Sequence, residues 1–151
     1  MREIRPTLRS LGEKGHEPMK EPARLLVVDD EEAILHLLTE FLTGKGYLVT
    51  SAANSVACLW ALDEFPDIRV ILLDNNMPGV TGLDLLPQIK RLKPGIGVII
   101  LTALNDWETS QEALRLGAFD YVVKPVNLSL LEMVVSKCLR ALNYESDRAP
   151  R

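Results

Sequence analysis

The sequence has few cysteines, histidines and aromatic residues, and it contains no long apolar run. Its 151 residues include 2 Cys and 2 His, and 5% are aromatic. Cys58 and Cys138 lie far apart without a C-x-x-C motif, so we expect reduced, partly buried thiols rather than a disulfide framework or a zinc site. No stretch approaches the roughly 18 to 20 apolar residues that cross a bilayer, and the charged N-terminus lacks the apolar centre of a signal peptide. We therefore expect a cytoplasmic location and no membrane contact.

The chain also lacks the excess of basic residues that a broad nucleic-acid surface needs. Its formal net charge is −4, whereas such a surface requires clustered Lys and Arg to displace counterions from phosphates. With 47% hydrophobic and 25% charged residues, the composition is that of one globular domain large enough to bury a core. We therefore expect no direct binding of nucleic acid.

The two ends of the chain differ from the middle. Residues 1–22 mix charged residues, Gly and Pro without sustained periodicity, and we expect them to form a flexible N-terminal tail. Met19 is an alternative translation start, which would leave residues 1–18 outside the native protein. We place the folded domain at residues 23–143 and a short C-terminal tail at residues 144–151.

Five short apolar runs alternate with segments of helical periodicity across the folded domain. The predicted strands are Leu25–Val28, Tyr47–Thr50, Val70–Leu73, Val98–Leu101 and Tyr121–Val123. Polar residues suited to cap helices precede the second, fourth and fifth helical segments, namely Asn54 or Ser55, Asp106 or Asn105, and Asn127 or Ser129. In the first helical segment we expect the core-facing residues to be Ile34, Leu35, Leu37, Leu38, Phe41 and Leu42. The alternation predicts an α/β fold with a doubly wound parallel sheet, (βα)5, covered by helices on both faces.

Charged and hydroxyl side chains follow four of the predicted strands. Asp29 and Asp30 follow the first, Asp74 the third, Thr102 the fourth and Lys124 the fifth. Because ligands of doubly wound sheets bind beyond the carboxyl ends of the strands, we expect these residues to converge. Clustered carboxylates repel one another unless a cation lies between them, and hard oxygen ligands without Cys or His favour Mg²⁺, or Mn²⁺, over zinc.

Each of these residues also has an ordinary structural interpretation. Acids after the first strand can complement the dipole at a helix N-terminus, a lone Lys at a strand end is normally solvated, and a lone Thr there is usually a cap. A carboxylate at the end of a central buried strand is costly without a partner, however, so Asp74 favours a joint site. A nucleophilic carboxylate, a cation, an ammonium and a hydroxyl at one edge are what phosphoryl transfer to Asp requires.

Four segments resemble the response-regulator receiver domain, the CheY-like module of two-component signalling. They are LLVVDDE at residues 25–31, LLDNNMPGVTG at 72–82, LTA at 101–103 and GAFDYVVKP at 117–125. They occur in the family's order and spacing across residues 24–142. The resemblance implies a flavodoxin-like fold with strand order 2-1-3-4-5.

The resemblance also implies roles for the residues at the sheet edge. Asp74 would be the phosphoacceptor, and Mg²⁺ would be held by Asp29, Asp30, Asp74 and the backbone carbonyl of Asn76. Lys124 would pair with Asp74 and then with the phosphoryl group.

The resemblance also implies residues that change position when the phosphoryl group is attached. Thr102 would turn its hydroxyl toward a phosphoryl oxygen, and the small Ala103 would let its loop close. Tyr121 would be the switch aromatic, with simple packing at a strand edge as the alternative. The Lys124–Pro125 peptide bond would be cis, which a tertiary amide makes inexpensive. Leu104 offers no hydrogen bond to an attacking water, so we expect slow hydrolysis of the aspartyl phosphate.

The implied function is that of a phosphorylation-controlled binding module. A sensor histidine kinase or a phosphotransfer protein would donate the phosphoryl group, and the surface of the fourth helix, fifth strand and fifth helix would then regulate a partner protein. The domain would be a monomer or a phosphorylation-dependent dimer. It would be no enzyme beyond catalysing its own phosphorylation and dephosphorylation.

Three other functions share parts of this pattern. A Mg²⁺-dependent aspartate phosphohydrolase typically carries a second acid where this chain has Asn76. A degenerate receiver that docks without phosphorylation would ordinarily lack Asp74, Thr102 or Lys124, and all three are present. An FMN-binding flavodoxin-like protein would need a phosphate beside the first loop, where Asp29 and the acids after it oppose one.

Overall fold

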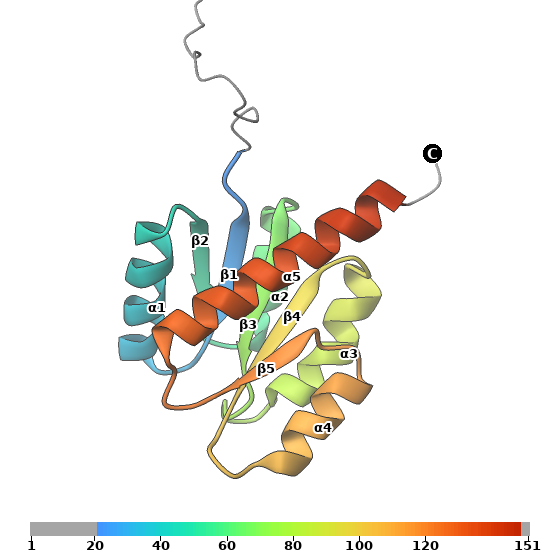
Figure 1. The fold of residues 1–151 in the computed structure, drawn as a ribbon. Coiled ribbons are helices and arrows are strands. Elements are labelled where there is room, and N and C mark those ends of the chain that lie inside the picture. The colour runs from blue at the N-terminus through green and yellow to red at the C-terminus, as the bar shows by residue number, and fades with distance from the viewer. Residues whose placement is uncertain (1–20, 149–151) are drawn as a thin grey trace, which may run out of the picture.

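The computed structural model describes residues 21–148, which form a five-stranded parallel sheet with helices on both faces (Figure 1). The strands are β1 (Arg24–Val28), β2 (Leu48–Ala52), β3 (Ile68–Asp74), β4 (Gly97–Thr102) and β5 (Asp120–Val123). The helices are α1 (Glu32–Gly44), α2 (Ser55–Glu64), α3 (Gly82–Leu92), α4 (Trp107–Arg115) and α5 (Leu128–Arg148). The strand order β2-β1-β3-β4-β5 confirms the predicted doubly wound fold.

The central strands bury both faces because successive side chains point to opposite sides of a sheet. On β1, Leu25 and Val27 pack in one apolar cluster with α1 and α5, whereas Leu26 and Val28 pack in a second cluster with α2, α3 and α4. Figure 1 shows α5 crossing the first of these faces. Two covered faces explain why β1, β3 and β4 are nearly continuous apolar runs rather than alternating ones.

Side-chain caps begin three of the helices at predicted positions. Each cap accepts a hydrogen bond from a backbone N–H in the first turn, which would otherwise have no partner inside the helix. The pairs are Asn54 with Ala57, Asp106 with Thr109, and Asn127 with Leu130. These polar residues therefore fix where the connecting loops end.

Two expectations about α1 and α5 were wrong. Leu37 of α1 was expected to face the core, but 45% of it is exposed. α5 continues to Arg148, so residues 144–148 are helical and do not belong to a C-terminal tail. No Gly or Pro interrupts the chain before Pro150, and each added helical residue gains a hydrogen bond once a helix exists. Residues 1–20 of the expected N-terminal tail and residues 149–151 lie outside the described residues.

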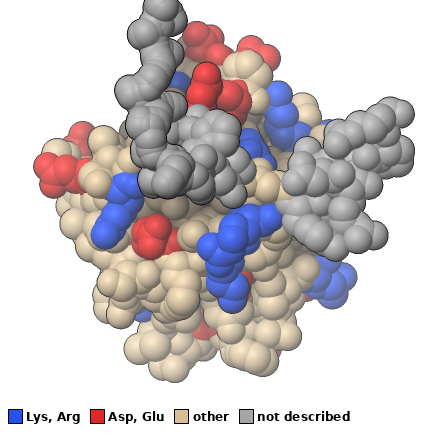
Figure 2. Space-filling view, turned by 45° about the horizontal axis from the view of Figure 1, so that its top comes forward, with Lys and Arg blue, Asp and Glu red and all other residues tan. Residues whose placement is uncertain are grey.

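The surface carries both signs of charge. On the face shown in Figure 2, basic and acidic side chains are interspersed, and neither sign forms a continuous area. In the described part of the chain, no helix combines the length and the apolar character that crossing a bilayer requires.

We expect Gly97→Ala to lower the free energy of unfolding by about 1–3 kcal/mol. Gly97 opens β4, and a Cβ atom added there would overlap the Sγ atom of the buried Cys138 on α5. Urea unfolding followed by circular dichroism measures the effect. Cys138→Ala in the same chain should remove the overlap, so the double variant should be more stable than the sum of the two single effects predicts. Additive effects would contradict this contact.

Candidate functional site

The carboxyl ends of the strands form the lower edge of the sheet in Figure 1, and the predicted site residues meet there. Asp29 follows β1, and Asp74 is the last residue of β3. Asp74 lies opposite Leu101 in the ladder of β3 and β4, so Thr102 stands one residue further along the neighbouring strand. Lys124 follows β5, and its backbone N–H donates to the Thr102 carbonyl oxygen at 2.7 Å. The parallel register thus places side chains from four strands at one edge.

Lys124 joins two of the carboxylates. Its Nζ lies 2.9 Å from Asp74 Oδ1 and 3.1 Å from Asp29 Oδ2. Asp29 and Asp74 are 0% and 1% exposed, whereas the Lys124 side chain is 19% exposed. Backbone donors complete the set, because Glu31 N–H donates to Asp29 and Asn76 N–H donates to Asp74. The two buried charges therefore share one ammonium group.

The donor set fits a hard divalent cation. Asp29, Asp30 and Asp74 each offer a carboxylate oxygen, and these oxygens lie within 4.8 Å of one another. Oxygen ligands at this spacing suit Mg²⁺, which needs few protein carboxylates because it retains water. Thr102 Oγ1 adds a second observation, since it is buried and has no hydrogen-bond partner among the described residues. A buried hydroxyl without a partner is costly, and a ligand oxygen at the site would satisfy it.

The electrostatics of the buried pair follow from burial and charge. Burial raises the pKa of Asp29, and the nearby charge of Asp74 acts in the same direction, while the hydrogen bonds from Glu31 and Lys124 only partly offset them. Burial alone would lower the pKa of Lys124, but its hydrogen bonds to Asp74 and Asp29 outweigh this, and the net shift is upward. Lys124 is therefore a persistent ammonium, and Asp29 holds its negative charge at a cost.

The remaining predicted residues lie around this centre. Ala103 follows β4 directly, and Tyr121 on β5 lies opposite Ile100 of β4 with its ring partly packed against the cluster beneath α2, α3 and α4. Asn76 lies in the loop between β3 and α3, next to the acid cluster through its N–H bond to Asp74. The Lys124–Pro125 peptide bond is cis, as predicted.

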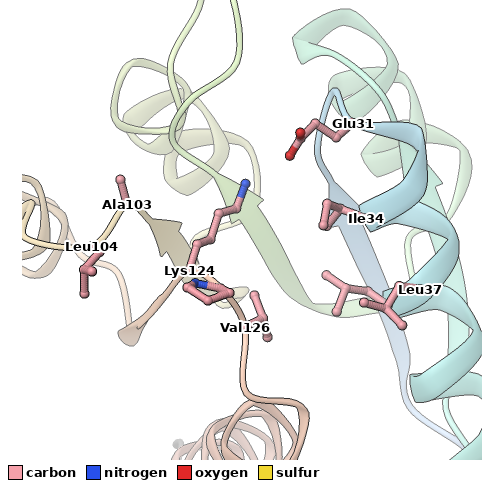
Figure 3. Close-up of a pocket in the computed structure, with 9 residues that line it drawn as sticks. Glu31, Ile34, Leu37, Ala103, Leu104, Lys124 and Val126 are labelled. Atoms are coloured by element: carbon pink, nitrogen blue, oxygen red, sulfur yellow. The ribbon is translucent and has the colours of Figure 1, made fainter.

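An apolar groove opens beside Lys124. It has a volume of about 480 Å³ and is lined mainly by α1, the loop after β4 and the loop after β5. Figure 3 shows Ile34 and Leu37 of α1 facing Val126 across the groove, with Leu104 on the far side of Lys124. Leu37 and Leu104 are 45% and 66% exposed, so this groove presents apolar surface at the edge of the acid cluster.

Three features of the site were not predicted from the sequence. Lys124 was expected to pair with Asp74 alone, but it also contacts Asp29. The side chain of Asn75 accepts from the backbone N–H of Leu83 at 3.0 Å. The groove is the third feature, because Leu37, which lines it, was expected to face the core. The N-cap preference gives no signal for Asn75, because the N-cap position of α3 is occupied by Thr81.

A family comparison identifies this arrangement. The model of the response regulator receiver domain matches residues 25–136. The chain belongs to this family. The receiver domain is 38% identical over 120 residues to the DNA-binding transcriptional regulator NtrC of Azospirillum brasilense, covering 79% of this chain and 24% of that protein. It is 37% identical to the regulatory protein AtoC of Escherichia coli K12, covering 82% of this chain and 27% of that protein.

Solved structures agree with the assignment. A response regulator receiver domain protein from Clostridium thermocellum has a TM-score of 0.75 and 34% identity, covering 82% of this chain and 97% of that one. The receiver domain of NtrX from Brucella abortus has a TM-score of 0.73 and 31% identity, covering 77% and 98%. The receiver domain spans about a quarter of the length of the curated relatives named above.

We expect Asp29→Asn to raise the free energy of unfolding at pH 7 without divalent cations, by on the order of 1 kcal/mol. Asn keeps the shape and one of the two acceptor oxygens, which serve the Glu31 N–H and Lys124 in Asp29, and it removes one of two buried negative charges. Because the folded-state pKa of Asp29 lies above 3.8, the stability that its protonated form provides is lost as the pH rises through that pKa. The advantage of the variant should therefore grow from acidic to neutral pH.

Urea unfolding in EDTA at pH 5 and pH 7 measures this difference. Asp30→Asn is the matched control, since Asp30 is exposed and should change stability less. Equal destabilisation by Asp29→Asn at both pH values would contradict the electrostatic account.

Proposed function

We propose that this receiver domain accepts a phosphoryl group on Asp74 in a Mg²⁺-dependent reaction and then regulates a partner through α4, β5 and α5. The observation that supports the proposal best is the set of side chains around Asp74. A buried carboxylate at the end of β3 has Lys124 at 2.9 Å, and on the adjacent strand lies the hydroxyl of Thr102, which has no hydrogen-bond partner within residues 21–148. These groups are suited to the negative oxygens of a phosphoryl group.

The transfer step conserves charge and electrons. A carboxylate oxygen of Asp74 attacks the phosphorus of a phosphohistidine whose imidazole is protonated at its other nitrogen. The bond from phosphorus to nitrogen breaks with its electron pair on the imidazole, which leaves neutral, and an acyl phosphate forms on Asp74. Lys124 remains beside the new phosphoryl oxygens as their ammonium partner. Thr102 then gains an acceptor for its hydroxyl, which draws the loop carrying Ala103 toward Asp74.

Asp29, Asp30, Asp74 and the backbone carbonyl of Asn76 would hold Mg²⁺. When bound, the ion neutralises phosphoryl charge and orients the phosphoryl oxygens. The carboxylate cluster supports this role, because its three oxygens lie close together, and burial together with the charge of Asp74 raises the pKa of Asp29, an unfavourable charge that a cation would stabilise.

A histidine kinase or a phosphotransfer protein is the proposed donor. The groove beside Lys124 supports a protein donor, since Leu37 and Leu104 expose apolar surface next to the acceptor. A helix that carries the phosphohistidine would cover this surface while its imidazole reaches Asp74. Small phosphodonors need no such contact.

The proposed output surface is formed by α4, β5 and α5. It exposes Trp107, Leu130 and Met133, which are 65%, 42% and 51% exposed, and it includes Tyr121. Rotation of the Tyr121 ring behind a moved Thr102 would couple this surface to Asp74. The relatives include DNA-binding transcriptional regulators. We therefore propose that the regulated partner is a protein that controls transcription, and that the receiver domain acts on it through protein–protein contacts.

The other functions have less support. Asn76 occupies the position where an aspartate phosphohydrolase would need its second acid. The carboxylates and the ammonium group of Lys124 argue against a receiver that has lost phosphorylation, and the acidic loop after β1 opposes the phosphate of FMN.

Acetyl phosphate and Mg²⁺ should add one phosphoryl group to the protein, read as a single mass increase by intact mass spectrometry. Asp74→Asn and omission of Mg²⁺ should each abolish the increase, because one removes the nucleophile and the other the charge neutralisation. Asp67→Asn is the matched control, since Asp67 lies just before the opposite end of β3 and pairs with Arg24. A wild-type protein that stays unmodified, or equal labelling of Asp74→Asn, would refute the proposal.

Leu104→Glu should hydrolyse its aspartyl phosphate several-fold faster than the parent protein. Leu104 is 66% exposed near the phosphoryl site and cannot orient a water, whereas a carboxylate there can act as a general base. Loss of the acyl phosphate is followed by intact mass after the donor is removed. Leu104→Met keeps an apolar side chain and should retain the parent rate. An unchanged or slower rate of hydrolysis in Leu104→Glu would contradict this role of Leu104.

A further inference from the structure

Three side chains accept hydrogen bonds from backbone N–H groups at the start of α3. Thr81, the N-cap residue, accepts from the backbone N–H of Asp84 at 3.1 Å, and the Asp84 carboxylate accepts from the Thr81 N–H. Asn75 lies outside the helix and accepts from the N–H of Leu83 at 3.0 Å. The bonds to Thr81 and Asn75 satisfy two first-turn donors, the N–H groups of Asp84 and Leu83, that a helix start leaves without partners. Of these side chains, Asn75 alone belongs to the segment that follows Asp74, so its bond joins that segment to the helix.

Asn75 lies between two residues of the proposed site. Its own backbone N–H donates to the Leu101 carbonyl of β4 at 3.0 Å, and the next N–H, of Asn76, donates to Asp74 Oδ1 at 3.1 Å. Only 8% of Asn75 is exposed, so its side-chain bond to Leu83 forms away from competing water. The chain is thus fixed to β4 on one side of Asn75 and to the carboxylate on the other.

α3 packs directly on this segment. A Cβ atom added at Gly82 would lie 2.8 Å from the Asp74 carbonyl oxygen and 3.1 Å from the Cα atom of Asn75. The close approach brings the first turn of α3 within reach of the Asn75 side chain. The bond from Leu83 to Asn75 is therefore one of the contacts that hold the segment after Asp74 against the helix.

We infer that Asn75 is a positioning residue, whose bond to Leu83 orients the segment that presents the Asn76 carbonyl to Mg²⁺. This inference rests on the proposed function of the site. Backbone carbonyls turn with the peptide that carries them, so a segment released from α3 would present the Asn76 oxygen in several orientations. Asn75 touches neither the ion nor the phosphoryl group in this account. It acts through the backbone that connects Asp74 to Asn76.

Three variants separate positioning from simple helix capping. Asn75→Leu keeps the branched shape and removes the acceptor. Thr81→Val removes the other cap of α3, and Asn75→Asp keeps an oxygen acceptor at the same place. Isothermal titration calorimetry with MgCl₂ gives the dissociation constant, and urea unfolding in EDTA gives stability. Both cap losses should lower stability, because each leaves a first-turn donor without its partner.

Only Asn75→Leu should weaken Mg²⁺ binding, by about 10-fold, which is the usual effect of removing a group that orients a metal ligand. Thr81→Val should stay within about two-fold of wild type, and Asn75→Asp should bind at least as tightly. Equal affinities of wild type and Asn75→Leu, or an equal loss in Thr81→Val, would overturn the inference.

A measurement on the wild-type protein covers the case in which Asn75→Leu does not fold. In ¹⁵N NMR spectra titrated with MgCl₂, the Leu83 amide should shift with the same dissociation constant as the Asn76 amide, because one side chain links them. A Leu83 amide that does not respond at saturating Mg²⁺ would overturn the inference. Failure of wild type to bind Mg²⁺ would instead count against the proposed function itself.

Discussion

The ammonium group of Lys124 lies between the buried carboxylates of Asp29 and Asp74, and the carboxyl edge of the sheet depends on that contact. Two like charges about 4 Å apart at an effective dielectric constant of 20 repel by about 4 kcal/mol. The shared Lys124 offsets part of this repulsion, and the pKa of Asp29 is still raised, mainly by burial and further by the charge of Asp74. Because negative charge remains at this edge, the edge is suited to bind a cation. Lys124 is suited to pair with the negative oxygens of a phosphoryl group.

The parallel sheet is what makes such a contact available. Lys124 is 95 residues from Asp29 and 50 residues from Asp74 along the chain, yet the strands deliver all three to one edge. Each crossover helix returns the chain to the opposite edge, so every strand in the sheet ends on the same side. The apolar clusters on both faces hold the strands in register, and the loops after them are free to carry polar side chains. Stability and chemistry are thus separated along each strand.

The sequence predicted what depends on local pattern and on strand direction. Apolar runs identified the strands, Asn54, Asp106 and Asn127 marked helix starts, and the parallel topology placed Asp74 with the other acids. It failed where the outcome depends on three-dimensional detail. The rotation of α1 that exposes Leu37, and the reach of Lys124 to Asp29 as well as Asp74, follow from packing between distant elements. The length of α5 was readable from the absence of Gly and Pro, but the polar composition of residues 143–148 obscured it.

The central claim is that one edge of the sheet holds both a divalent cation and a phosphoryl group, with ligands from four strands. A crystal structure of the protein with Mg²⁺ and beryllium trifluoride, a stable mimic of the phosphoryl group, tests it most directly. The account predicts the mimic on Asp74, with Lys124 Nζ and Thr102 Oγ1 each within hydrogen-bond distance of a fluorine. The ion should lie against Asp29, Asp30 and the Asn76 carbonyl. A mimic bound elsewhere, or Thr102 still without a partner in the loaded protein, would contradict the account.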